Sequence, residues 1–139
     1  MFDLIIREHK KLYARPQIFV KAITSAANAG DVIVATVTTQ PCQIDSIVVR
    51  SNGATTANLT SIGVYGGASK VVTFIDASTG VLANINAADK QVSWPDASSG
   101  VTFAATKTIV MTLTGTGATA VDLQVDFYYH AIADGGYLA

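Results

Sequence analysis

The residues best suited to catalysis lie near the C-terminal end of the chain, where His130 follows Asp122 and Asp126 in the stretch VDLQVDFYYH. A histidine next to a carboxylate is the usual pairing of a general base with its orienting group. The stretch alternates apolar and polar residues, which predicts a β-strand, and four residues of strand separate His130 from Asp126 by about 13 Å. That distance excludes a direct hydrogen bond, so we expect His130 to be a surface histidine.

Asp122 and Asp126 lie on the same face of this predicted strand, and paired carboxylates can carry out acid–base chemistry. Every second residue of the strand is polar, however, so we expect the two to keep the outer face of a sheet hydrated. Three other aspartates, Asp31, Asp76 and Asp96, stand beside turn residues, where aspartate has a local backbone role. We therefore predict no catalytic residues and no enzyme.

Metal and redox chemistry have few ligands here, because the chain holds one cysteine, Cys42, and two histidines, His9 and His130. A single cysteine forms no intramolecular disulfide, and these three residues make no recognisable metal-binding motif, so Cys42 is expected to be a small buried residue. The glycines of GVYGGAS and GTGAT lack the lysine of a phosphate-binding loop. No cofactor, metal or small-molecule substrate is expected.

Aromatic residues offer one further site, since Trp94 together with Tyr65, Tyr128 and Tyr137 could stack on a sugar. Trp94 precedes Pro95, and the tyrosines fall in separate segments. We therefore favour packing in a core or an interface over a carbohydrate-binding platform.

The elements that would position these residues are predominantly strands, because apolar residues recur with a period of two from Gln17 onward. Turn signals separate the runs at 27–31, 51–56 and 115–119, and a short helical turn is expected near Ala87–Lys90. The expected strands cover residues 17–26, 31–39, 42–51, 57–67, 70–76, 101–105, 106–115 and 121–130. Such closely spaced strands predict an all-β fold, an antiparallel β-sandwich with the eight strands of a jelly roll. The tail ADGGYLA is expected to be a second docking segment or a frayed end.

Charge divides the chain into two parts, an N-terminal arm over 1–16 and a sandwich domain over 17–139. Five of the nine Lys and Arg residues fall within the first 21 positions, so residues 1–21 carry a net charge of +3 and the rest −4. Charged residues make up 14% of the chain, against about a quarter in typical proteins. A surface this poor in charge indicates that other subunits cover part of it.

The basic segment is either an interaction arm or a solvated helical face. It has too few charges, and too few aromatic residues among them, for a nucleic-acid partner. No run of 18 apolar residues exists, so no membrane partner is expected either.

The stretches GDVIVATVTTQPCQIDSIVVRSNGATTANLTSIGVYGG and GTGATAVDLQVDFYYHAI resemble small virion proteins of tailed bacteriophages, in particular capsid decoration (cement) proteins with a jelly-roll body. The resemblance implies a structural protein, made in the host cytoplasm, that forms a homo-oligomer, often a homotrimer. It would sit on the outer surface of the capsid and bind the major capsid protein. A tail, collar or fibre protein and a carbohydrate-binding adhesion module are the alternatives.

In such a protein the arm would make the contacts between subunits. Its apolar residues would serve as anchors, and its basic residues would pair with acidic neighbours. The residues expected at this protein interface are Leu4, Ile5, Arg7, Lys10, Lys11, Leu12, Tyr13 and Arg15.

Overall fold

The structure is a computed structural model, and it describes residues 15–23, 26–53, 58–94, 100–120 and 122–139. The described residues form ten strands and one short 3₁₀ helix. These are β1 (Gln17–Ile23), β2 (Ala26–Thr38), β3 (Cys42–Ser51), β4 (Leu59–Gly66), β5 (Val72–Ile75), η1 (Leu82–Asn84), β6 (Gln91–Trp94), β7 (Val101–Phe103), β8 (Thr108–Ala120), β9 (Leu123–Ala131) and β10 (Tyr137–Leu138).

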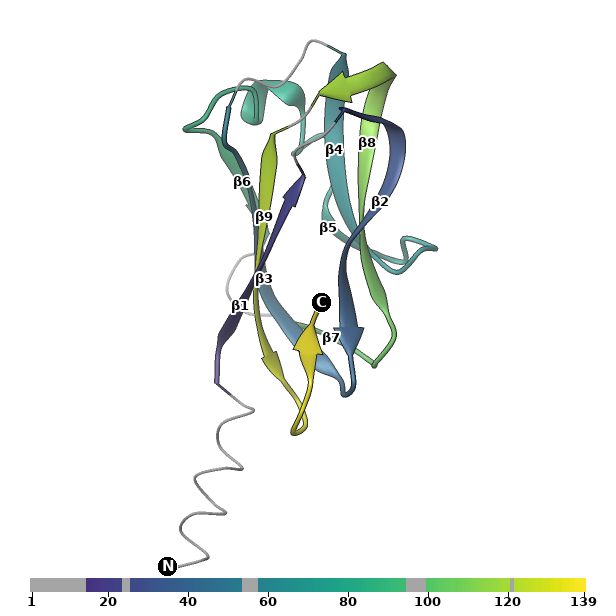
Figure 1. The fold of residues 1–139 in the computed structure, drawn as a ribbon, viewed down its shortest axis with the longest axis vertical. Helices are drawn as coiled ribbons and strands as arrows, with labels where there is room; N and C mark the ends of the chain where they lie inside the picture. Colours follow the sequence, from purple (N-terminus) through teal and green to yellow (C-terminus); the bar gives the residue numbers. More distant parts are fainter. Residues whose placement is uncertain (1–14, 24–25, 54–57, 95–99, 121) are drawn as a thin grey trace, which may run out of the picture.

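The strands form two sheets that face each other, as Figure 1 shows. The first sheet has the order β1-β9-β3-β6, with β7 also paired to β3, and the second has the order β10-β2-β8-β4-β5. All pairings are antiparallel. Strand β9 lies between β1 and β3, and β8 lies between β2 and β4, so each sheet interleaves strands from both ends of the chain. This interleaving is the result of two Greek keys, and it confirms the predicted jelly roll.

The core lies between the sheets and comes from residues that alternate along each strand. On β9, Leu123, Val125, Phe127 and Tyr129 are buried, as the alternation predicts. On β3 the alternation changes phase: Ile44 and Ile47 are both fully buried although three positions separate them. The reason is a β-bulge between Ile44 and Ser46, which inserts Asp45 and keeps apolar residues pointing inward on both sides of it.

Two predicted turns are wrong. Residues 27–31 belong to β2, where the register with β8 shifts between Asn28 and Gly30, so Gly30 (φ 149°) accompanies an irregularity in the strand pairing instead of a turn. Residues 115–119 belong to β8, whose pairing with β2 continues to Ala120. Gly115 is needed there for close packing, because a Cβ atom would lie 2.1 Å from the carbonyl oxygen of Asn58.

The region between β5 and β7 also differs from the prediction. The 3₁₀ helix covers Leu82–Asn84, whereas the expected helical turn at 87–90 is a single turn closed by a hydrogen bond from Lys90 N to Ala87 O. Strand β6, which the sequence did not predict, is the jelly-roll strand next to β3, while the predicted strand at 101–105 is reduced to the three residues of β7.

The C-terminal tail pairs within its own chain. Strand β10 adds to the edge of β2, and Ala139 and Thr36 exchange backbone hydrogen bonds of 2.8 and 3.0 Å. Leu138 is 4% exposed and belongs to the core. The tail is therefore part of the sandwich and is not frayed.

Candidate assembly surfaces

Most of the predicted arm lies outside the described residues. This holds for Leu4, Ile5, Arg7, Lys10, Lys11, Leu12 and Tyr13. Arg15 and Pro16 are described, and both are exposed immediately before β1. The interface role of the arm, and the boundary at residue 16, remain predictions.

His130 pairs with an aspartate, but not with one from its own strand. Its Nδ1 lies 2.8 Å from Oδ2 of Asp45, and Gln43 donates a hydrogen bond of 3.2 Å to the other carboxylate oxygen. The bulge in β3 places Asp45 there, opposite the end of β9. The His130 side chain is only 26% exposed, so the expected free surface histidine is in fact a partly buried member of a polar cluster.

Asp126 corrects the prediction of a hydrated carboxylate, because it is 3% exposed. Arg50 on β3 forms an ion pair with its Oδ2, and Gln124 donates a hydrogen bond of 2.7 Å to its Oδ1. Val20 on β1 is the residue opposite Asp126, and both side chains lie on the outer face of the first sheet. The carboxylate is thus neutralised and enclosed, and it has a structural role.

The remaining sequence candidates are also structural. Cys42 is fully buried, as predicted, and burial raises the pKa of its thiol. Trp94 packs edge-to-face on Phe74, with ring centroids 4.6 Å apart. Tyr65 and Tyr128 lie on β4 and β9 of different sheets, and Tyr137 lies on β10. The four aromatic residues do not form one platform.

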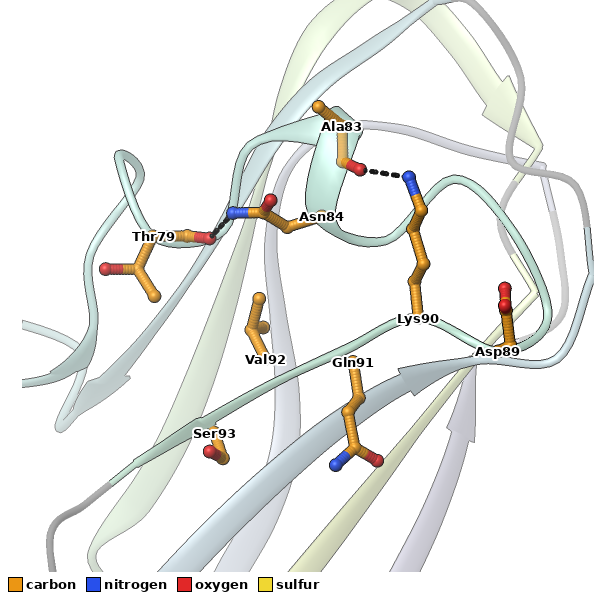
Figure 2. Close-up of a pocket in the computed structure, with 8 residues that line it drawn as sticks. All are labelled: Thr79, Ala83, Asn84, Asp89, Lys90, Gln91, Val92 and Ser93. Atoms are coloured by element: carbon orange, nitrogen blue, oxygen red, sulfur yellow. Dashed lines mark hydrogen bonds between the residues drawn. The ribbon is translucent and has the colours of Figure 1, made fainter.

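A shallow pocket of about 580 Å³ lies between η1 and β6 (Figure 2). Two of its polar side chains bond to backbone carbonyls that line it: Lys90 Nζ donates to the carbonyl of Ala83 at 2.7 Å, and Asn84 Nδ2 donates to that of Thr79 at 2.9 Å. These bonds tie η1 to the start of β6 and to the preceding loop. The residues that line the pocket are Thr79, Ala83, Asn84, Asp89, Lys90, Gln91, Val92 and Ser93.

The described part of the chain holds no group of three or more His, Cys, Asp or Glu side chains that could bind a metal ion. No helix among those residues is long and apolar enough to cross a membrane.

The outer face of the second sheet carries a charged bridge. Lys70, at the β4–β5 turn, reaches Asp31 on β2 at 2.8 Å, and Thr112 on β8 donates to the same oxygen at 2.7 Å. These hydrogen bonds lower the pKa of Asp31. The Lys70 ammonium also lies 5.5 Å from the centre of the Tyr65 ring.

Exposed apolar residues mark the surfaces that suit protein contacts. Ile18 is 61% exposed and Val20 50% exposed, and both lie on the outer face of β1, the edge strand of the first sheet. The other large exposed apolar residues in the described regions are Ile33, Val71, Ile132 and Tyr137.

Sequence reasoning missed three features: the Arg50–Asp126 pair, the position of Asp45 and the exposed edge of β1. The phase change in CQIDSIVV, where Ile44 and Ile47 are three residues apart, is a signal for the bulge and hence for Asp45. The other two depend on which strands become neighbours, and no local pattern contains that information.

Solved structures with this fold include components of two phage capsids. A chain of the acid-stable capsid of Helicobacter pylori bacteriophage KHP30 matches with a TM-score of 0.54 and 13% identity, over 90% of this chain and 98% of that one. A chain of the capsid asymmetric unit of cyanophage Pam1 matches with a TM-score of 0.50 and 15% identity, over 84% and 85%. At these identities the likeness establishes the fold, a jelly-roll sandwich that extends over almost the whole of both matched chains.

No protein-family model matches the sequence, and no curated protein is similar to it.

Proposed function

We propose that this protein is a structural component of a phage virion, which sits on the outer surface of the capsid and stabilises it. The observation that carries the proposal is the fold: the same jelly roll makes up 98% of a chain in one phage capsid and 85% of a chain in another. In those two matched chains the sandwich accounts for most of the length, which suits a subunit that acts through its surfaces.

The chemistry of the described residues supports the same proposal. Among the described residues, His130 pairs with Asp45 and Asp126 pairs with Arg50, so these candidate acid–base groups are engaged in local contacts. The low charge of the chain suits subunit contacts, since few charges lose their hydration when a surface is covered.

Within this role, residues 1–16 are proposed to bind neighbouring subunits, either further copies of this chain or the major capsid protein. The arm enters the fold through β1, whose exposed apolar residues extend the contact surface beyond it. An arm that becomes ordered on docking can cover a large area with few residues.

Deletion of residues 1–16 tests this assignment. The shortened chain should keep its sandwich fold, measured by circular dichroism and thermal unfolding, and should no longer sediment with capsids that lack the native protein. A matched control replaces Arg7, Lys10 and Lys11 by Gln in the full chain, which removes charge and keeps the apolar anchors. Full capsid binding by the deleted chain would refute the role of the arm.

A further inference from the structure

Strand β1 stands out among the sheet edges because it is long and unprotected. It has seven residues and pairs only with β9 among the described residues, in a register that runs without a shift from Gln17 to Ile23. Native edge strands are normally kept short, bulged or charged, since a free edge can pair with another chain. Strand β1 has none of these features over Gln17–Val20, and its only charged residue is Lys21.

The other edges of the sandwich show such protection. Strands β5 and β6 have four residues each, β7 has three and β10 has two. Strand β2 is long, but its register with β8 shifts twice, near Gly30 and near Val34, and it carries Asp31. The contrast singles out β1 as the edge that is suited to pairing.

We propose that β1 pairs antiparallel with β1 of a second copy of this chain, about a two-fold axis at Phe19. This inference deepens the proposed function by naming one surface through which the subunits associate. The first sheets of the two copies would then join into one continuous sheet.

The sequence of β1 is complementary to itself in this register. Ile18 of each copy lies opposite Val20 of the other, so the two large exposed apolar residues of the strand cover each other. Lys21 lies opposite Gln17, a neutral amide, and no two like charges face each other. In this register, odd-numbered residues lie opposite odd-numbered ones and even-numbered opposite even-numbered. Alternate residues of β1 direct their N–H and C=O groups away from β9, so the free groups of the two copies lie opposite each other and can form hydrogen bonds.

Neighbouring registers fit less well. A two-fold axis at Ile18 would bring two like charges together, Arg15 and Lys21, and would break the contact between Ile18 and Val20. An axis at Val20 would place Lys21 opposite Phe19 and break the contact between Ile18 and Val20. The register at Phe19 is therefore the one that satisfies both the apolar and the charged residues.

This pairing also gives the arm a direction. Residues before Gln17 of one copy would pass Ala22 and Ile23 of the second copy and continue over it, because the strands run antiparallel. Each arm would thus reach the other copy, as a contact between subunits through the arm requires. A two-fold contact yields a dimer or another even-numbered assembly, in contrast to the trimer that the resemblance implies.

Two double variants test the pairing. They differ only at position 18, which carries Lys in one and Glu in the other. In Ile18→Lys/Val20→Lys, residue 18 of each copy would face residue 20 of the other, which gives two pairs of like charges across the interface. In Ile18→Glu/Val20→Lys the same positions would form two oppositely charged pairs. Both variants lose the same apolar surface, and both keep the same lysine beside Asp126, the neighbour of Val20 on β9. Position 18 faces the neutral Tyr128, so neither substituted residue meets a charged cross-strand partner within the monomer.

Sedimentation equilibrium of the full chain at low salt should show an even-numbered assembly for the wild type. The Kd for self-association of the Lys/Lys variant should be at least about 100-fold larger than that of the Glu/Lys variant. Added salt should reduce this difference. A trimeric or monomeric wild type, or equal association of the two variants, would overturn the proposal. Protection of the Cys42 thiol would verify that each variant is folded.

These measurements need no capsid. The pairing of β1 can therefore fail while the virion role stands, and the virion role can fail while the pairing stands.

Discussion

Asp126 owes its burial to residues that are distant in the sequence. Its ion-pair partner Arg50 is 76 positions away, and the strands that carry the two residues become neighbours only in the jelly roll. The Asp126 side chain is 5% exposed, whereas Arg50 keeps 41% of its side chain in solvent. The arginine thus neutralises a carboxylate that the fold has enclosed.

Replacement of Arg50 by Ala should destabilise the protein, because it leaves the Asp126 carboxylate buried without its cation. Breaking a fully buried pair costs about 3–5 kcal/mol, and the partial exposure of Arg50 lowers the expected loss to about 2–3 kcal/mol. Urea unfolding measures the change. The double variant Arg50→Met/Asp126→Asn should lose less than Arg50→Ala, and a loss below about 0.5 kcal/mol for the single variant would contradict this role.

Cys42 should be inert in the native protein. The thiolate is the reactive form, burial raises the pKa of this thiol, and no part of the residue is exposed. A thiol reagent at neutral pH should label Cys42 only when urea unfolds the chain. As a control, Cys42→Ala/Ser69→Cys carries its thiol at an exposed position and should be labelled at once. Rapid labelling of native wild-type protein would show that the region around β3 opens.

At the scale of elements, the C-terminal strand β10 is integral to the second sheet. It is only two residues long, yet Leu138 is buried in the core and Ala139 pairs with Thr36. The strand also covers the last residues of the β2 edge, so its contribution should exceed what its length suggests.

Leu138→Ala should lower the free energy of unfolding by about 2–4 kcal/mol, as buried leucine substitutions do. Tyr137→Ala, one residue earlier and 45% exposed, is the matched control and should cost less than about 1 kcal/mol. Urea unfolding of both variants gives the comparison. Equal losses would mean that β10 is held by its backbone alone.

How much the sequence could predict varies from element to element. Strand β9 was predictable because Leu123, Val125, Phe127 and Tyr129 alternate without interruption. Strands β6 and β10 were not, because turn residues adjoin both short runs: Pro95 follows β6, and Gly135 and Gly136 precede β10. Glycine was a misleading turn signal at two positions. Gly30 lies at an irregularity in the pairing of β2 with β8, and Gly115 makes a close backbone contact.

The candidate sites were less predictable than the strands. The polar face of β9 was correctly located, but the burial of Asp126 and the Asp45–His130 contact depend on β3, which lies next to β9 only in the folded chain. The exposed edge at Ile18 and Val20 depends likewise on strand order, which no local pattern encodes.

At the scale of the whole molecule, the described residues form one jelly-roll sandwich with its core between the two sheets. Its described polar clusters are paired internally, and its longest unprotected edge is β1, next to the basic N-terminal segment. The proposed virion role, the proposed arm contacts and the proposed pairing of β1 share one physical basis, which is contact between subunits.

The most direct test is quantitative mass spectrometry of virions made from the genome that encodes this chain, purified on a density gradient and washed in high salt. If the protein is a capsid component, it should stay with the particles, in a fixed ratio to the major capsid protein. Particles emptied of DNA and freed of tails should retain it at the same ratio. Absence of the protein from washed particles, or its loss together with the tails, would refute this role.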